Sequence, residues 1–213
     1  MQEGKRPRSD RKKDVKPFLT LSTKESIYRL SYITQTPVKD VAATLLTAAL
    51  TNVKILNALS AHFKRDIRIN QTLFRGNLSN PVIQKKQDPE TCERISLRVT
   101  QRVYDILSAL AYALDCSKAR TCALLLENSM SDFEIVNEYL KNYLEQGLDK
   151  RRMAEVNKLM SFINKELPEK DYSYMHLLSH MVDEVNTPVS STKEMVDEFI
   201  IHHWCLLQNR SAD

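Results

Sequence analysis

The chain contains only three glycines, seven prolines and one tryptophan in 213 residues. So few turn-forming residues, together with long apolar periodicities, predict a mostly helical protein. No apolar run reaches the roughly 18 to 20 residues that a membrane helix needs. The charged N-terminus is not followed by an apolar segment, so we expect neither a signal peptide nor a membrane partner.

The sequence also lacks the residue patterns of metal and catalytic sites. The four cysteines, Cys92, Cys116, Cys122 and Cys205, have no C-x-x-C spacing and predict buried, reduced thiols in a cytoplasmic protein. His176 and His180 are four residues apart, and His202 and His203 lie near Cys205, but no paired ligand set accompanies them. Phosphate-loop, nucleophile-elbow and metalloprotease motifs are missing. We therefore expect no enzyme, no metal and no other cofactor.

The charge is divided unevenly along the chain. Residues 1–130 carry 22 Lys and Arg against 12 Asp and Glu, whereas residues 131–213 carry 9 against 15. The basic part favours a polyanion partner, of which nucleic acid is the first candidate, and the acidic part favours a different partner. Ordinary surface charge that happens to segregate is the alternative.

A strand–helix–helix pattern occurs twice. The first copy has an alternating apolar segment at 18–23 and helical patterns at 26–34 and 37–51, and the second has the equivalent segments at 94–100, 103–114 and 118–130. Aligning Ile27 with Val103 superposes the two strands and requires about one extra helical turn in the second copy. One such unit cannot bury its own apolar face, so we expect the copies to pair, either within one chain or between chains.

These patterns divide the chain into five segments. Residues 1–16 are expected to form a disordered basic arm, 17–63 the first copy, 64–93 a basic connector with a short strand at 67–73, 94–130 the second copy, and 131–213 an acidic helical domain. The last segment has four short amphipathic helical patterns. It is expected to form a small bundle that joins chains into a homo-oligomer or binds a protein partner.

The segment Ile95-Ser-Leu-Arg-Val with its two following helices resembles the ribbon-helix-helix family of DNA-binding proteins, and Leu19-Thr-Leu with its own helices resembles it more weakly. The resemblance implies a mainly α fold in which two units intertwine. Their strands then form a short two-stranded antiparallel β-ribbon that enters the major groove of double-stranded DNA. The turns at 34–36 and 115–116 lack the glycine that is common in the family.

The resemblance also implies which side chains touch DNA. By position, the base-reading residues are Arg94, Ser96 and Arg98 in the second copy and Phe18, Thr20 and Ser22 in the first. Arg98 is the strongest candidate, because arginine pairs in bidentate fashion with guanine. Phosphate contacts are expected from Lys24, from Thr36, Ser117 and Lys118 at helix N-termini, and from Arg6, Arg8, Arg11, Lys12 and Lys13 in the arm. A charged edge strand that blocks aggregation is the alternative explanation for the strand residues.

The sequence therefore predicts a cytoplasmic, nucleoid-associated protein that binds double-stranded DNA sequence-specifically, with transcriptional repression or regulation as its simplest role. A relaxosome accessory protein of a conjugative element would have the same features. A helical protein-interaction scaffold with a non-specific basic arm is a further alternative. Strand pairing at residues 95–99 distinguishes the two, because a helix there would remove the ribbon and with it the prediction of DNA binding.

Overall fold

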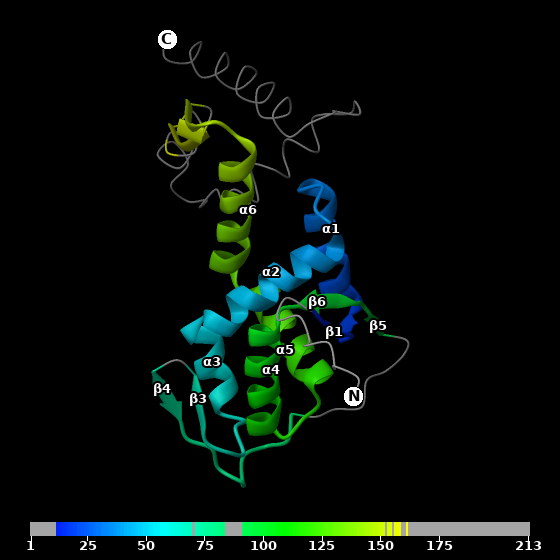
Figure 1. The fold of residues 1–213 in the computed structure, drawn as a ribbon, viewed down its shortest axis with the longest axis vertical. Helices are drawn as coiled ribbons and strands as arrows, with labels where there is room; N and C mark the ends of the chain where they lie inside the picture. Colours follow the sequence, from blue (N-terminus) through cyan, green and yellow to red (C-terminus); the bar gives the residue numbers. More distant parts are fainter. Residues whose placement is uncertain are drawn as a thin grey trace, which may run out of the picture. The chain divides into compact units, whose positions relative to one another are not determined.

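The computed structural model of the chain describes residues 12–69, 71–83, 91–151, 153–154, 156–158 and 161 (Figure 1). Helices make up most of this part, and its strands are short and antiparallel. The predicted class, mainly α with short antiparallel strands, is therefore confirmed. The chain divides into two compact units, Met1–Tyr32 with Thr36–Ile135 and Ile33–Gln35 with Val136–Asp213.

Two series of elements follow one another along the chain. The first repeat consists of β1 (Lys13–Val15), β2 (Phe18–Thr20), α1 (Leu21–Ile33), α2 (Val38–Thr51) and α3 (Val53–Ser60). A connector with β3 (Ile67–Ile69) and β4 (Thr72–Phe74) comes next. The second repeat consists of β5 (Cys92–Arg94), β6 (Leu97–Val99), α4 (Gln101–Leu114), α5 (Lys118–Ser131) and α6 (Phe133–Gly147). Each repeat thus has a third helix. The apolar pattern of Val53, Ile55, Leu56 and Leu59 predicts α3 within the first copy, and α6 corresponds to the first of the four helical patterns expected after residue 131.

The helices of the two repeats are spaced by a constant 80 residues. The first helices begin at 21 and 101, the second run over 38–51 and 118–131, and the third begin at 53 and 133. This spacing corrects the predicted alignment, in which Ile27 matched Val103 and the second copy had an extra turn. Ile27 corresponds to Leu107, and both are fully buried. The apolar pattern was misleading because a shift of four residues, about one turn, keeps the same stripe on the same side of a helix.

The first helices of the two repeats end in the same turn. Gln35 and Asp115 have positive φ values of 48° and 53°. The next residue in each case, Thr36 or Cys116, donates its N–H to a carbonyl five residues back, over 3.2 Å and 3.1 Å. This is the Schellman arrangement, in which glycine usually takes the left-handed position. The missing glycines are therefore replaced by glutamine and aspartate without a change of turn.

The strands of the two repeats pair within one chain. β1 is antiparallel to β6, with Val15 opposite Leu97, and β2 is antiparallel to β5. Both ladders keep one register, and a further backbone hydrogen bond of 3.1 Å joins them. Residues 13–20 and 92–99 therefore form one continuous two-stranded ribbon, with Lys16 opposite Ser96 at its centre.

The ribbon is attached to a core made by both repeats. α2 packs against α5; α2 also contacts β6, and α5 contacts β1 and β2, so each helix supports the strand of the other repeat. The buried residues of α2 are Val41, Ala42, Leu45, Leu46, Ala49 and Leu50, and those of α5 are Thr121, Cys122, Ala123, Leu124, Leu125, Leu126 and Ser129. Each fully buried leucine contributes about 1.5–3 kcal/mol to folding.

None of the described helices is by itself long and apolar enough to cross a membrane. α2 and α3 meet that criterion only as a pair, and the chain bends by 71° between them. Asn52 forms this bend, where its side chain accepts a hydrogen bond of 3.1 Å from the N–H of Ile55 and caps α3.

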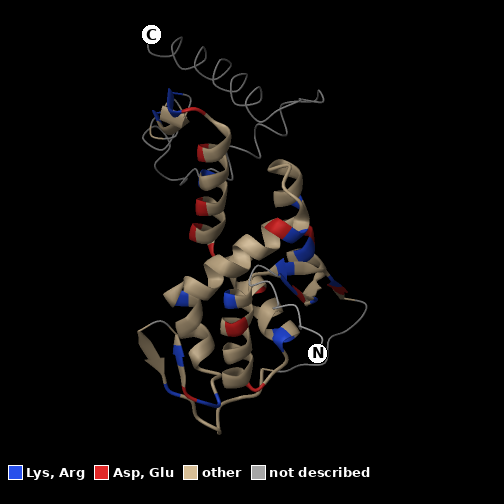
Figure 2. Cartoon of the chain, viewed as in Figure 1, with Lys and Arg blue, Asp and Glu red and all other residues tan. Residues whose placement is uncertain are grey.

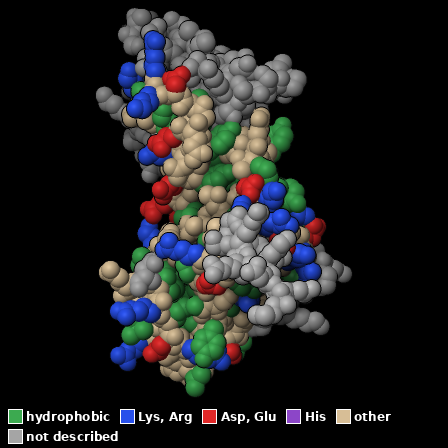
Figure 3. Space-filling model, viewed as in Figure 1, with side chains coloured by type: hydrophobic (Ala, Val, Ile, Leu, Met, Phe, Trp, Pro, Cys, Tyr) green, Lys and Arg blue, Asp and Glu red, His purple; other side chains and the backbone are tan. Residues whose placement is uncertain are grey.

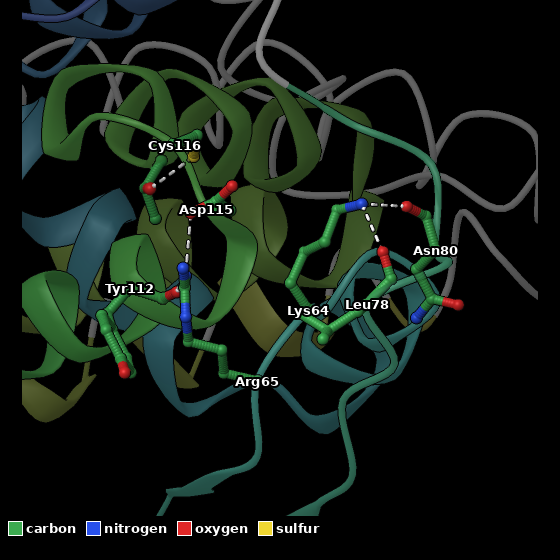
Figure 4. A network of polar contacts seen from close by, with 8 residues as sticks. Lys64, Arg65, Leu78, Asn80, Tyr112, Asp115 and Cys116 are labelled. Atoms are coloured by element: carbon green, nitrogen blue, oxygen red, sulfur yellow. Dashed lines mark hydrogen bonds and ion pairs between the residues drawn. The ribbon is translucent and has the colours of Figure 1, made fainter.

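The connector folds back onto the end of α4 (Figure 4). The backbone N–H of Arg65 lies 3.3 Å from the carbonyl of Ala113, and its guanidinium donates to the carbonyl of Tyr112 over 2.6 Å. The same guanidinium pairs with Asp115 at 2.8 Å and lies 4.4 Å from the centre of the Tyr112 ring. Arg65 therefore satisfies carbonyl groups that a helix C-terminus leaves without intrahelical partners.

The rest of the connector is held by two close approaches. Phe63 and Phe74 pack edge to face, with ring centres 5.8 Å apart, which attaches the β3–β4 hairpin. A Cβ atom on Gly76 would lie 2.4 Å from the backbone of Arg65, so this position requires glycine. The predicted single strand at 67–73 is accordingly a hairpin.

The first strand differs from the prediction at both ends. Pairing begins at Lys13, inside the segment expected to be a disordered arm, and it ends at Thr20 rather than at residue 23. The Thr20 hydroxyl accepts a hydrogen bond of 3.3 Å from the N–H of Thr23, which starts α1 at Leu21. The alternation of Leu19 and Leu21 was therefore not a strand pattern: Leu19 is buried, whereas Leu21 is 37% exposed.

Two further boundaries are corrected. Thr36 was expected to cap the next helix, but Pro37 occupies the N-cap position of α2 and no side chain caps it. The strand expected at 94–100 is divided into β5 and β6, and β5 takes its first two residues from the segment expected to be connector. The predicted cap of the following second helix, Ser117, is confirmed, since its hydroxyl accepts from the N–H of Arg120 over 3.1 Å.

The second unit is described mainly through α6. Val136, Leu140 and Leu144 are buried on one side of this helix. The hydroxyl groups of Thr34 and Tyr139 lie 3.2 Å apart, which joins the turn after α1 to α6 within this unit. After α6, the sequence predicts a helix near 150–166, and the residues of this range that the structure describes are helical. The helices predicted further along lie outside the described residues.

Candidate nucleic-acid interface

Side chains alternate between two faces of the ribbon. The inward face is apolar and buried at Val15, Pro17, Leu19, Ile95, Leu97 and Val99, and its two ends carry the exposed Lys13 and Glu93. The outward face is polar and exposed over most of its length, with Asp14, Lys16, Thr20, Arg94, Ser96, Arg98 and the half-buried Phe18, and it ends at the buried Cys92 opposite Thr20. The core thus fixes one side of the ribbon and leaves the other available to a ligand.

An ion pair lies toward one end of the outward face. Asp14 and Arg98 are directly opposite in the register, and Arg98 donates from Nε to Oδ1 of Asp14 over 2.9 Å. The side chains of Arg98 and Asp14 are 65% and 54% exposed. A solvent-exposed pair of this kind contributes only about 0–1 kcal/mol to stability, so it orients the arginine more than it holds the fold.

An arginine–aromatic pair lies toward the other end. Phe18 is opposite Arg94, whose guanidinium carbon lies 4.4 Å from the centre of the Phe18 ring. Stacking over a ring directs a guanidinium without using its N–H donors. Lys16 and Ser96 separate the two arginine sites at the centre of the ribbon.

Five of the six predicted base-reading residues lie on this outward face, and Ser22 does not. Ser22 belongs to the first turn of α1, where its carbonyl accepts a hydrogen bond of 2.9 Å from the Ser26 hydroxyl. Thr20 is on the face, but its hydroxyl donates to that of Thr23 over 2.9 Å. All three predicted base-reading residues of the second copy therefore lie on the outward face, whereas only two of the three from the first copy do.

Asp14 and Lys16 belong to the same face and were missed. Both were included in the expected arm, and the strand expected at 18–23 has no basic residue among its outward positions Phe18, Thr20 and Ser22. Alternation through Val15, Pro17 and Leu19 was the available signal, but proline at the middle of a strand argued against it. Here the carbonyl of Pro17 accepts from the N–H of Ile95, and this pairing does not require an N–H from proline.

Two of the predicted phosphate-binding groups are engaged by the protein itself. Lys24 forms an ion pair with Glu93, and this hydrogen bond raises the pKa of the Lys24 ammonium above its ordinary value. The N–H of Thr36 is used in the turn after α1, and Thr36 does not begin α2. Both contacts would have to change before these groups could bind a phosphate.

The second repeat has a clearer helix N-terminus. Ser117 caps α5, and the next residue, Lys118, places its ammonium 4.7 Å from the centre of the Tyr104 ring. Both residues are exposed. A capped N-terminus beside a lysine is a favourable anion site. Of the predicted arm residues, Lys12 and Lys13 are exposed, Lys12 just before the ribbon and Lys13 at its first position. Arg6, Arg8 and Arg11 lie outside the described residues.

Basic residues of the first unit lie on the ribbon and on the connector, and also on α2, α3, α4 and α5. Lys and Arg positions lie along the ribbon and the start of α1, and again along the connector (Figure 2). In the space-filling view, basic side chains are visible beside the ribbon and over the β3–β4 hairpin (Figure 3). Arg68 and Arg75 are exposed on that hairpin. The ribbon differs from the hairpin because its outward basic residues alternate with buried apolar residues along both strands.

The described part of the chain contains no group of three His, Cys, Asp or Glu residues that could hold a metal ion. Cys92 and Cys122 are buried, Cys116 is half-buried, and none of the three forms a disulfide. Burial raises the pKa of the Cys122 thiol to about 12 and also raises that of Cys116. These thiols are therefore protonated at neutral pH and are poor nucleophiles. Cys205 and the four C-terminal histidines lie outside the described residues.

Comparisons of the chain with protein-family models, with curated proteins and with solved structures found no match.

Proposed function

We propose that this chain is a tandem ribbon-helix-helix protein that binds double-stranded DNA sequence-specifically, with its two copies paired inside one chain. The observation that carries the proposal is the ribbon: two segments about 80 residues apart form one antiparallel pair with an apolar inner face and a polar, arginine-bearing outer face. A major groove about 12 Å wide admits a two-stranded ribbon.

The chemistry of the outer face fits base edges. Arg94 and Arg98 each present N–H donors suited to the O6 and N7 acceptors of guanine, while Ser96 and Lys16 offer donors between them. The side chains project from regular strands, which positions donors more accurately than loops do. The capped N-terminus of α5, with Lys118 beside it, is suited to a backbone phosphate.

The role proposed for this binding is transcriptional repression or regulation, without catalysis and without a cofactor, in the cytoplasm at the nucleoid. A relaxosome accessory protein would use the same interface. The C-terminal helices would join chains into a homo-oligomer or bind a protein partner, which would increase affinity through effective concentration. Pairing of residues 97–99 as β6 supports DNA binding over the helical-scaffold alternative, because a helix there would have removed the ribbon.

The test is selection from random duplex DNA at near-physiological salt, with the full chain and with Arg94→Ala and Arg98→Ala. We expect the wild-type chain to enrich one non-palindromic motif, and each variant to lose discrimination at a different base position, because each bidentate pair contributes about 1–3 kcal/mol. Arg68→Ala on the exposed hairpin strand β3 is the matched control and should keep the motif. Salt-sensitive binding without any enriched motif would contradict sequence-specific reading, and no binding would contradict the whole proposal.

A further inference from the structure

The carboxylate of Asp14 is unexpected on a surface proposed to face DNA. It projects from the outward face of the ribbon, and its exposed fraction is 54%. A negative charge on this face weakens binding to any phosphate backbone. Its ion pair with Arg98 is too exposed to contribute much to folding. The position therefore needs an explanation in the recognition step.

The geometry of the ion pair supplies one. Arg98 donates to Asp14 through Nε, so this hydrogen bond does not use the outer edge of the guanidinium, which Nη1 and Nη2 form. A bidentate contact with guanine O6 and N7 uses two N–H groups of this planar fork. Holding the fork by Nε before DNA arrives reduces the side-chain ordering that binding would otherwise require.

The same carboxylate also selects among neighbouring bases. Asp is an acceptor only, and in the major groove it is suited to the N4 amino donor of cytosine. A guanine or thymine edge that faces the carboxylate instead of the guanidinium presents only acceptors and is repelled, as are phosphate oxygens. One residue therefore orients Arg98 toward guanine and disfavours the wrong partners, which is how specificity commonly arises.

The other end of the ribbon has no carboxylate beside its arginine. Arg94, which corresponds to Asp14 in the 80-residue spacing, is stacked on Phe18 instead of being paired with a carboxylate. An aromatic ring orients a guanidinium but repels no base. The two arginine sites, about 13 Å apart along the strand at about 3.3 Å per residue, therefore differ in stringency.

We infer that Asp14 is a positioning and specificity-determining residue that sharpens recognition of a guanine-containing base step by Arg98. The inference rests on the proposed function. Discrimination between bases at the Arg98 end then depends on the carboxylate of Asp14, whereas discrimination at the Arg94 end does not.

The experiment compares the wild-type chain with Asp14→Asn, Arg98→Ala and the double variant, by selection from random duplexes and by anisotropy titrations on cognate and scrambled DNA. Glu138→Gln on α6 is the matched control for the loss of one negative charge. For Asp14→Asn we expect stronger binding to scrambled DNA and a loss of about five- to tenfold in discrimination at the base step affected by Arg98→Ala. The position affected by Arg94→Ala should not change, and at the guanine read by Arg98 the double variant should lose no more discrimination than Arg98→Ala alone.

Each outcome separates the two proposals. A wild-type motif that Asp14→Asn preserves with unchanged discrimination would overturn the role of Asp14 and leave the proposed function intact. Equal relaxation at all positions, or the same change in Glu138→Gln, would reduce Asp14 to a general charge effect and also overturn it. A wild-type chain without a motif would overturn the proposed function itself.

Discussion

The two repeats share a backbone and differ in what surrounds it. Their helices keep a constant 80-residue spacing, and their first helices end in the same left-handed turn. In the second repeat that turn is held by Arg65 of the connector, whereas in the first repeat it belongs to the unit that contains α6. Because both repeats lie on one chain, their side chains are free to diverge while the backbone geometry is kept. A dimer of identical chains lacks that freedom, since its interface is the same on both subunits.

The largest expected effect comes from detaching the connector from the second repeat. Gly76→Ala places a Cβ atom 2.4 Å from the backbone of Arg65, which cannot move without losing its contacts to α4. We expect a loss of about 2–3 kcal/mol in the free energy of unfolding, measured by urea denaturation. Gly147→Ala is the control, because nothing lies within 4 Å of its new Cβ atom. Equal stability of the two variants would show that the connector is not packed on α4.

A smaller effect concerns a core position at which the repeats differ. Cys122 corresponds to Ala42, and both are fully buried. The pKa of Cys122 is raised from 9.0 to about 12 in the folded chain, so folding favours the neutral thiol. Stability from this group is fully present below pH 9 and is lost as pH rises toward 12, by about 1.4 kcal/mol per pH unit.

Urea unfolding at pH 8 and pH 10 tests this difference. We expect the wild-type chain to lose about 1 kcal/mol more than Cys122→Ala over that interval. Cys116→Ala, which removes a less buried thiol, should give a smaller difference. The assignment is wrong if the wild-type chain and Cys122→Ala have the same pH dependence.

The smallest expected effect distinguishes the two left-handed turns. Gln35→Gly removes the cost of a positive φ at a residue with a Cβ atom and should stabilise the chain by about 1 kcal/mol. Asp115→Gly removes the same cost but also the ion pair with Arg65, so its gain should be close to zero. Urea midpoints of both variants and of Gln35→Ala, which keeps the Cβ atom, measure the contrast. Equal gains at the two turns would mean that the Arg65 ion pair contributes nothing.

The sequence was sufficient to predict that the unit occurs twice, although not how the two copies align. It was also sufficient to place their second helices, since α5 begins at the predicted Lys118 and α2 ends at the predicted Thr51. Those helices have strong apolar stripes, and α5 has a capping serine besides. The first strand was misplaced because its pairing depends on residues about 80 positions away. Nothing local distinguishes Lys13–Val15 from a charged arm, and Pro17 argues against a strand.

Only part of the candidate site could be predicted, because the rest depends on pairing between segments that are distant in the sequence. Arg94, Ser96 and Arg98 alternate with apolar residues, so their common face is visible in the sequence. Asp14 becomes relevant only when the register places it opposite Arg98. The contact between Arg94 and Phe18 likewise depends on pairing between distant segments, which no local pattern specifies.

Closure of the ribbon inside one chain also determines how the protein is made. While the first repeat leaves the ribosome, residues 13–20 have no strand to pair with until residues 92–99 have also been synthesised. The ribbon then forms by a loop closure of long sequence separation, which is slow compared with helix formation. Its formation is nevertheless first order, so the outward face of the ribbon, once folded, persists at any dilution. A protein of this design remains assembled at the few copies per cell at which a two-chain ribbon would dissociate.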